Sequence, residues 1–426
     1  MRVPNLFTHR RTGQLRSKAT GRAPLIHTLF PTSADRSVVP VFAARALRGF
    51  ADGFVAVLLP VYLLAVGLNS VQIGAIATAT LLGSALATLA VGAYGHRYHA
   101  RTLMLAAAIL MALTGLGFAG LSTFWPLLIV AFIGTINPSS GDVSVFLPLE
   151  HARLAATYAG IVKTETFARY ALTGALCAAL GALASGVPDR AVTWFHLQRL
   201  DALRAMFVLY AVIGIVVWVS YRALPQDEFA PAAKPAALGQ SRKVVIQLAA
   251  LFSVDSFAGG LVVNSLLALW LFQQFGLSLA AAGLFFFCSS LLGAVSQLAA
   301  PKIASRFGLV NTMVFTHIPA SLCLIAAAFA SNVVLALGLL LARALVSSMD
   351  VPARSAFVMS VVQPHERAAA ASFTAVPRSL ASAASPVLAG WLFHSGWSAT
   401  PLVVCGVLKI AYDLALWHAF ARFNDA

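Results

Sequence analysis

Apolar runs recur along the chain about every thirty residues, and short polar turns separate most of them. A helix needs roughly 20 apolar residues to cross a hydrocarbon core about 30 Å thick. The pattern therefore predicts an all-α membrane protein with twelve transmembrane helices. We expect these helices at about 41–66, 71–95, 102–121, 126–149, 160–186, 203–222, 245–274, 278–300, 310–330, 333–352, 368–395 and 399–421.

One long polar stretch between the predicted helices, "RALPQDEFAPAAKPAALGQSRK" at 222–243, divides them into six and six. Its proline, alanine and mixed charge are typical of a flexible connector. The expected organisation is a basic cytoplasmic tail, an N-terminal six-helix bundle, a cytoplasmic linker, a C-terminal six-helix bundle and a short tail. The corresponding ranges are 1–40, 41–222, 223–243, 244–421 and 422–426.

The second half of the chain repeats the first half at a shift of about 209 residues. Matches of glycine are common in such a composition, but matches of arginine and aspartate inside apolar runs are not. The matched pairs are Gly67 with Gly276, Gly74 with Gly283, Arg97 with Arg306, Asp142 with Asp350, Arg169 with Arg378 and Gly181 with Gly390. A parallel repeat of this kind predicts two pseudo-symmetric six-helix bundles.

The composition, 60% hydrophobic with a net charge of +15, agrees with a membrane protein whose positive charge sets its orientation. The predicted outer loops hold only Arg190, Arg199 and Arg204, whereas the other loops and the tails hold most of the remaining lysine and arginine. Because cytoplasmic loops carry the excess of these residues, both termini should be cytoplasmic. We therefore expect a multi-pass protein of the inner (plasma) membrane and no nucleic-acid partner.

Six helices plus six, a central linker and both ends inside resemble the Major Facilitator Superfamily. The loop motif "GAYGHRYHAR" at 92–101 keeps Gly92, Arg97 and Arg101 of the superfamily pattern, with His96 in place of its usual aspartate. The counterpart "PKIASRFGLV" keeps Arg306 and Gly308. The resemblance covers about 40–421 and implies a secondary transporter that works by alternating access.

Two stretches, "VDSFAGGLVVNSLLALWL" and "GTINPSSGDVSVFLPLE", are similar to a bacterial subgroup associated with efflux of trivalent arsenicals and antimonials. We expect proton-coupled export of a small solute, and that resemblance makes a metalloid such as arsenite the specific candidate. Two alternatives stay open. One is proton-coupled uptake of a small organic solute, and the other is a membrane scaffold or sensor that transports nothing.

Carboxylates within the predicted spans are candidate proton or substrate sites, because charge in a membrane is costly and usually faces a partner or a wet cavity. Asp52 lies about 16 Å into its span at 1.5 Å per residue. An ion pair with Arg48, four residues earlier, is the alternative. Asp255 has no cation nearby on its own helix, and Asn264 adds a polar group to the same span. We expect Asp52, Asp255 and Asn264 to line a proton and substrate cavity.

Other charged residues in the spans suggest ion pairs. The spacing of four predicts local pairs between Lys409 and Asp413 and between Glu165 and Arg169. The repeated aspartates and arginines allow two arrangements. Crossed pairs, Asp142 with Arg378 and Asp350 with Arg169, would form a gate between the bundles. Pairs within each bundle, Asp142 with Arg169 and Asp350 with Arg378, would hold helices together instead.

The spans contain no motif for hydrolysis or metal binding, and the chain has no P-loop. The four cysteines, Cys177, Cys288, Cys323 and Cys405, lie in apolar segments without a ligand spacing. We therefore expect no catalytic residue, no metal site and no cofactor, and hence no enzyme. The expected partners are the lipid bilayer, a small-molecule or ionic substrate and protons, and the expected assembly is a monomer.

Overall fold

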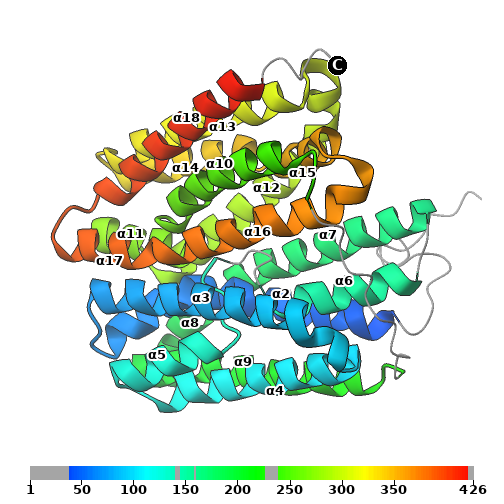
Figure 1. The fold of residues 1–426 in the computed structure, drawn as a ribbon. Helices are drawn as coiled ribbons and strands as arrows, with labels where there is room; N and C mark the ends of the chain where they lie inside the picture. The colour runs from blue at the N-terminus through cyan, green and yellow to red at the C-terminus, as the bar shows by residue number, and fades with distance from the viewer. Residues whose placement is uncertain (1–37, 140–143, 158–159, 226–237, 421–426) are drawn as a thin grey trace, which may run out of the picture. The chain divides into compact units, whose positions relative to one another are not determined.

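A computed structural model describes residues 38–139, 144–157, 160–225 and 238–420, and every regular element in these ranges is a helix. The helices belong to one compact unit, Asp35–Ala426. In the first half of the chain they lie together (Figure 1) and are α2 (Val39–Ala65), α3 (Ser70–Tyr94), η1 (Gly95–Arg97), α4 (Ala100–Gly120), α5 (Phe124–Ile133), α6 (Phe146–Thr157), α7 (Gly160–Ala184), α8 (Val187–Phe195) and α9 (Arg199–Arg222).

The second half follows the same plan with helices that also lie together (Figure 1). They are α10 (Arg242–Gly260), α11 (Asn264–Phe275), α12 (Leu279–Phe307), α13 (Leu309–Ala328), α14 (Val333–Ser347), α15 (Asp350–Val361), η2 (Pro364–Glu366), α16 (Arg367–Ala384), α17 (Pro386–His394) and α18 (Thr400–Phe420).

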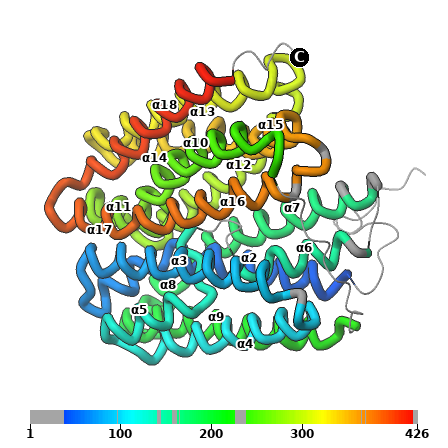
Figure 2. Tube along the Cα trace, viewed as in Figure 1, coloured from blue at the N-terminus to red at the C-terminus, as the bar shows by residue number. Residues whose placement is uncertain are grey.

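Ten segments in the described part of the chain are long and apolar enough to cross a membrane. The two further spans expected from the sequence are present as composites. Residues 126–149 include most of α5, the non-helical residues 134–139 and the start of α6, while 368–395 include nearly all of α16 and the whole of α17. Figure 2 follows α16 into α17 as one run across the picture. Twelve spans therefore fit the structure, and α8 is a short helix that the hydrophobic pattern did not predict.

Several spans are interrupted near their middle. α10 ends at the Gly259–Gly260 pair, and α11 begins only at Asn264. Backbone freed by such a break must find another partner inside a membrane protein. Here the Ser265 N–H donates to the Pro138 carbonyl at 3.0 Å. Because Pro138 lies in the interrupted span of the first half, the two breaks join the two halves.

The turns explain both the repeat and a departure from it. Gly67 and Gly276, matched in the sequence, each turn the chain with a positive φ, 93° and 61°. Gly308 also needs this freedom, with φ 85°. Its counterpart His99 adopts an ordinary φ of −64°, so the first loop motif tolerates a histidine where the second requires glycine.

The C-terminal end of the linker is tied to the turn between α15 and α16. The buried Glu366 carboxylate accepts the Gly239 N–H at 2.7 Å and the Ser241 N–H at 3.0 Å. Ser241 Oγ in turn accepts the Gln363 N–H at 3.2 Å. Glu366 thus caps the start of α10, where unpaired N–H groups favour an anion. The pKa of Glu366 lies below the ordinary glutamate value, chiefly because the Ser241 side chain stabilises the charged form and further because the Gly239 and Ser241 N–H groups donate to it.

Candidate functional site

The two halves of the chain meet closely at the end of the helices where α2 turns into α3 and α11 into α12, which we call the Ser70 end. A Cβ built on Gly74 of α3 would lie 2.5 Å from the Pro386 carbonyl oxygen and 3.0 Å from the Gly390 Cα. A Cβ on Gly283 of α12 would lie 2.5 Å from the Ala182 carbonyl oxygen. Gly74 and Gly283 are repeat mates, so two related contacts close this end.

Polar contacts reinforce the closure. Gln273 Nε2 donates to Ser70 Oγ at 3.0 Å, and the Val387 N–H donates to Thr78 Oγ1 at 3.0 Å. Both bonds join a helix of the first half to a helix of the second. These contacts join the two halves at the Ser70 end. An apolar hollow of about 410 Å³ lies beside them, lined by α3, α5 and Val387 of α17.

A cavity of about 150 Å³ lies between the halves, toward the opposite end, which we call the Arg97 end. It is mostly apolar and carries three hydroxyls. The lining comes from α3, from the start of α6 with the residue Ser144 before it, and from α16, and consists of Ala85, Thr88, Leu89, Ser144, Leu147, Pro148, Ala375, Val376 and Ser379. A space walled by both halves on this side is where a small solute can lie.

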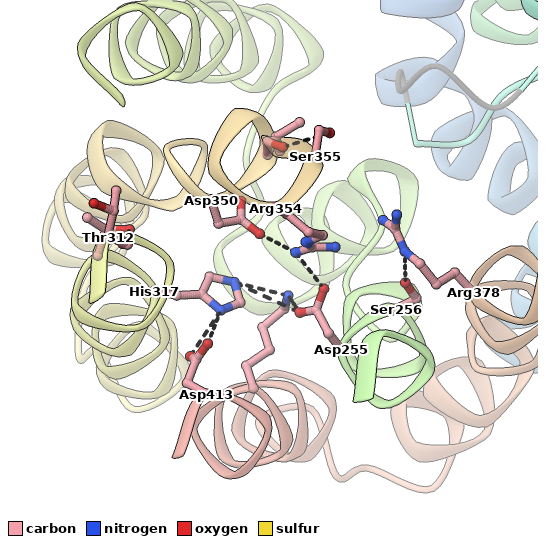
Figure 3. A network of polar contacts seen from close by, with 12 residues as sticks. Asp255, Ser256, Thr312, His317, Asp350, Arg354, Ser355, Arg378 and Asp413 are labelled. Carbon is pink, nitrogen blue, oxygen red and sulfur yellow. Dashed lines mark hydrogen bonds and ion pairs between the residues drawn. The ribbon is translucent and has the colours of Figure 1, made fainter. Parts of the chain in front are cut away.

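Six ionisable side chains form a buried group within the second half, which we call the C-terminal charge cluster (Figure 3). They come from α10, α13, α15 and α18 and are Asp255, His317, Asp350, Arg354, Lys409 and Asp413. Each of the six is less than 10% exposed. Buried charges are stable only when they are paired and hydrogen-bonded, so the contacts between these residues decide what the cluster can do.

Asp255 is the centre of the C-terminal charge cluster. Its Oδ1 accepts from Lys409 Nζ at 2.6 Å, and its Oδ2 lies 3.0 Å from the Arg354 guanidinium. Arg354 also pairs with Asp350, one turn earlier on α15. Asp255 had no cation nearby in its own helix, but packing gives it two from other helices.

His317 links the remaining members. Its Nδ1 lies 3.0 Å from Asp413 Oδ2, and its Nε2 lies 3.3 Å from Lys409 Nζ. The expected local pair between Lys409 and Asp413 is therefore wrong: the two side chains share one helix face but turn to different partners. The local pair between Glu165 and Arg169 is confirmed, at 3.9 Å.

The first half has a simpler buried ionic site around Glu150 of α6. One oxygen of this carboxylate accepts from both Arg48 of α2 and the Tyr170 hydroxyl of α7. The other accepts the Tyr221 hydroxyl of α9 at 2.7 Å. One carboxylate thus joins four helices, and this arrangement indicates a structural role that holds the helices together.

The cavity candidates from the sequence lie in different surroundings. Asp52 is half-buried on α2, one turn beyond Arg48, whose ion pair is with Glu150. Asn264 is half-buried and begins α11, directly beside the break that bonds to Pro138. Asp255 is enclosed in the C-terminal charge cluster, so the structure does not bring the three together.

The proposed gate residues have other partners in this structure. Asp350 pairs with Arg354, and Arg169 with Glu165. Arg378 Nε donates to Ser256 Oγ at 3.2 Å, and no carboxylate of the described residues lies within ion-pair distance of it (Figure 3). Asp142 lies outside the described residues.

The loop-motif residues lie at the Arg97 end. Arg101 donates to the Arg222 carbonyl at 2.7 Å, at the C-terminal end of α9. Arg97 lies 5.5 Å from the Tyr94 ring centroid, and Arg306 lies 5.4 Å from that of Phe307. Gly92 faces open space, and the side chain of His96 lies outside the described residues.

The family model of the Major Facilitator Superfamily matches residues 41–342 and again 248–422. The chain belongs to this superfamily. The resemblance seen in the loop motif is thereby confirmed, and the protein is a membrane transporter by family and by fold rather than an enzyme.

Proteins similar to this chain in sequence or in fold match it over nearly its whole length. The uncharacterized membrane protein YJR124C of Saccharomyces cerevisiae is 25% identical over 430 residues, which cover 92% of this chain and 96% of the relative. The nucleoside transporter NupG has a TM-score of 0.71 at 15% identity and covers 91% of this chain and 99% of its own. A D-xylose–proton symporter has a TM-score of 0.70 at 13% identity, with coverage of 89% and 97%. At these identities the solved structures show a shared fold.

Sequence reasoning missed three central residues, Glu150, Arg354 and His317. Glu150 lies one residue beyond the span expected at 126–149, and Arg354 lies two residues beyond the span expected at 333–352, so both fall in predicted loops. His317, in the apolar run "VFTHIPAS", is uncharged at neutral pH and did not stand out among the charged residues. A histidine inside a predicted span was the available signal, since such residues usually have a buried partner.

Proposed function

We propose that this protein is a proton-coupled secondary transporter that exports a small solute across the inner (plasma) membrane by alternating access. It would act as a monomer, with both termini and the linker in the cytoplasm. Superfamily membership supports transport, and the lysine and arginine distribution supports the orientation. Export, rather than the uptake considered from the sequence, rests on the resemblance to the arsenical efflux subgroup.

The observation that carries the proposal is the asymmetry between the two ends. The Ser70 end is joined by Gly74 against Gly390 and by Gly283 against Ala182, and the hollow beside these contacts is apolar and more open. The more enclosed cavity, which carries three hydroxyls, lies toward the Arg97 end. With the termini inside, the Arg97 end faces the cytoplasm. The structure then corresponds to the state in which an exporter receives its solute.

The crossed gate belongs to the opposite state in this proposal. Closing the Arg97 end would bring α16 toward the first half, and Asp350 would exchange Arg354 for Arg169. When the gate is open, each gate residue would pair with a neighbour on its own helix. Asp350 pairs with Arg354 here, and Arg169 pairs with Glu165. The pair of Asp142 with Arg378 would form in the same step.

Proton coupling is assigned to ionisable groups inside the spans. Asp52 is half-buried on α2 and Asp255 lies within the C-terminal charge cluster. Neutralising such a group alters the balance of charge that holds the helices, because charge in a membrane interior is costly. A proton gradient can therefore favour one of the two states.

Purified protein in proteoliposomes that contain a pH-sensitive dye tests the proposal. Arsenite, a nucleoside and a pentose are each added under an imposed pH gradient, and solute and proton movements are recorded together. We expect one solute class to move against its gradient with a counterflow of protons. Asp52→Asn should abolish this coupled movement. Asp201→Asn, at an exposed position of α9, is the matched control. Solute movement without proton flux would contradict the coupling. Movement of solute and protons in the same direction would favour uptake.

A further inference from the structure

The C-terminal charge cluster contains one imidazole, His317, and its hydrogen-bond partners indicate which ring nitrogen carries the hydrogen. An ionised carboxylate only accepts hydrogen bonds, and an ammonium only donates. Nδ1 of His317 lies 3.0 and 3.1 Å from the two oxygens of Asp413, so Nδ1 donates. Nε2 lies 3.3 Å from Lys409 Nζ, so Nε2 accepts.

Lys409 is an ammonium in this arrangement because its Nζ lies 2.6 Å from Asp255 Oδ1, a distance typical of a charge-assisted hydrogen bond. His317 is consequently a neutral imidazole with its hydrogen on Nδ1. Its Nε2 lone pair is the acceptor that a proton can occupy, and the only interaction to be displaced is the hydrogen bond from Lys409.

We infer that His317 binds a proton that drives transport, in addition to the carboxylates proposed above, and that Lys409 and His317 exchange places on Asp255 when this proton binds. A proton from water adds to the Nε2 lone pair, and the hydrogen bond from Lys409 to Nε2 is lost. Asp255 Oδ1, 4.0 Å from Nε2, can then accept from the new Nε2–H. Lys409 keeps its own proton and moves away from the imidazolium because the two charges repel.

The charged and titratable groups around His317 come from the helices packed against α13 and from α10. α18 contributes Lys409, Asp413 and the Tyr412 ring, whose centroid is 6.3 Å from the imidazole. α10 contributes Asp255, and α15 contributes Asp350 and Arg354, which bind each other. α14 also packs against α13, but its Arg343 makes no ion pair or hydrogen bond with His317 among the described residues. α12 carries Lys302 and Arg306, near its C-terminal end.

With His317 neutral, the six-residue cluster holds three carboxylates and two cations, Arg354 and Lys409. A further cation, Arg378 of α16, is close enough to interact electrostatically with Asp255 and Asp350. The Glu150 site of the first half holds one carboxylate and one guanidinium with two tyrosines as donors, and the His151 ring lies 5.3 Å from that of Tyr170.

The exchange acts on a helix that joins the two halves. Asp255 lies on α10, and α10 leads through the break at 261–263 into α11. The first turn of α11 holds the hydrogen bond from Ser265 to Pro138 in the other half. When Lys409 leaves Asp255, α10 loses a bond to α18. Residues 261–263, which follow α10, can then move, and the hydrogen bond from Ser265 to Pro138 can change. That the proton drives transport rests on the function proposed above, whereas its binding at His317 does not.

Nitrogen-15 NMR of the histidine-labelled full chain in lipid nanodiscs tests the site with the proton itself as the ligand. An ordinary imidazole titrates at about pH 5 to 8. We expect one of the ten histidines to show the neutral Nδ1–H form at the alkaline end and the imidazolium at the acid end. Labelled lysine should show the Lys409 ammonium signal changing over the same pH range. The histidine signal is assigned by its loss in His317→Gln or, if that variant does not fold, by its shift in Asp413→Asn.

A neutral Nε2–H form, a ring that does not titrate, or a Lys409 signal that ignores the titration would each overturn the inference. A merely structural histidine would give one of these results. Failure of the proteoliposome experiment would leave this titration unaffected, so the two failures are distinguishable. If both hold, His317→Gln should lose the pH dependence of proton-driven transport.

Discussion

Gly74 of α3 and Gly390 of α17 lie so close that a Cβ added to Gly74 would come within 3.0 Å of the Gly390 Cα. The two residues belong to different halves of the chain, and their contact closes the Ser70 end. Backbone this close cannot yield as a flexible side chain would. The contact is therefore sensitive to a single methyl group.

Gly74→Ala should open the Ser70 end. Overpacking costs about 1–3 kcal/mol, which corresponds to a fall of about 5- to 150-fold in the closed state relative to the open state. A cysteine at the buried position Ser70, in a cysteine-free protein, should then react faster with a membrane-impermeant maleimide. Gly92→Ala on the same helix is the control, because nothing lies within 4 Å of the added Cβ. Equal labelling in both variants would refute the role of the contact.

Glu150→Gln should destabilise the protein by about 3–5 kcal/mol, because it leaves the buried Arg48 guanidinium without its counter-charge. Thermal unfolding in detergent measures this loss. Glu165→Gln on α7 is the matched control, since Glu165 is largely exposed and its pair with Arg169 spans 3.9 Å. An exposed pair contributes at most about 1 kcal/mol. A small loss in both variants would show that Glu150 does not hold the four helices together.

Asp255→Asn should also destabilise the protein, because Lys409 and Arg354 both lose their shared carboxylate. Adding Lys409→Met should restore part of the lost stability, since one stranded cation is removed while Arg354 keeps Asp350. The expected coupling between the two substitutions is about 0.5–3 kcal/mol. The four melting temperatures of this double-mutant cycle provide the measurement. Strictly additive losses would mean that the two side chains do not interact.

Glu366 should make stability depend on pH on the acid side. Its pKa in the folded protein is lower than the ordinary value of 4.5, so the unfolded chain takes up a proton first as the pH falls. The stabilisation is therefore complete well above pH 4.5 and is lost as the pH falls through the lowered pKa. The melting temperature of Glu366→Gln should lie below that of the wild type near neutral pH. This difference between the two proteins should become smaller at acid pH. Asp201→Asn, at an exposed position of α9, is the control. Parallel profiles for wild type and Glu366→Gln would refute the assignment.

Replacing the four cysteines with alanine should leave transport intact, including any arsenite transport. Cys177, Cys288 and Cys323 are half-buried on α7, α12 and α13, and Cys405 is buried on α18. Soft thiolates would be the preferred ligands of a trivalent metalloid, but these thiols belong to four different helices. Arsenite flux in proteoliposomes compares the variant with the wild type. A folded variant without arsenite flux would instead show that thiols bind the solute.

The sequence by itself determined the class of protein, the positions of the spans and the repeat. These properties depend on local composition and on spacing along the chain, since an apolar run of sufficient length forms a helix wherever it packs. The matched glycines show the same: Gly67 and Gly276 are turn residues with positive φ, and Gly74 and Gly283 both lie where the halves touch. The interruption of the long spans was less predictable, because it depends on partners such as Pro138.

Only the tertiary structure decided how the buried charges pair. A spacing of four places Lys409 and Asp413 on one face of α18, and sequence reasoning could only join them to each other. Packing instead brings Lys409 to Asp255, 154 residues away, and to His317, 92 residues away. The same holds for Arg48 and Glu150, which are 102 residues apart. Which helix faces meet is set by the fit of all the helices together. The chemistry of a neutral His317 between an ammonium and a carboxylate therefore appears only when the helices are assembled.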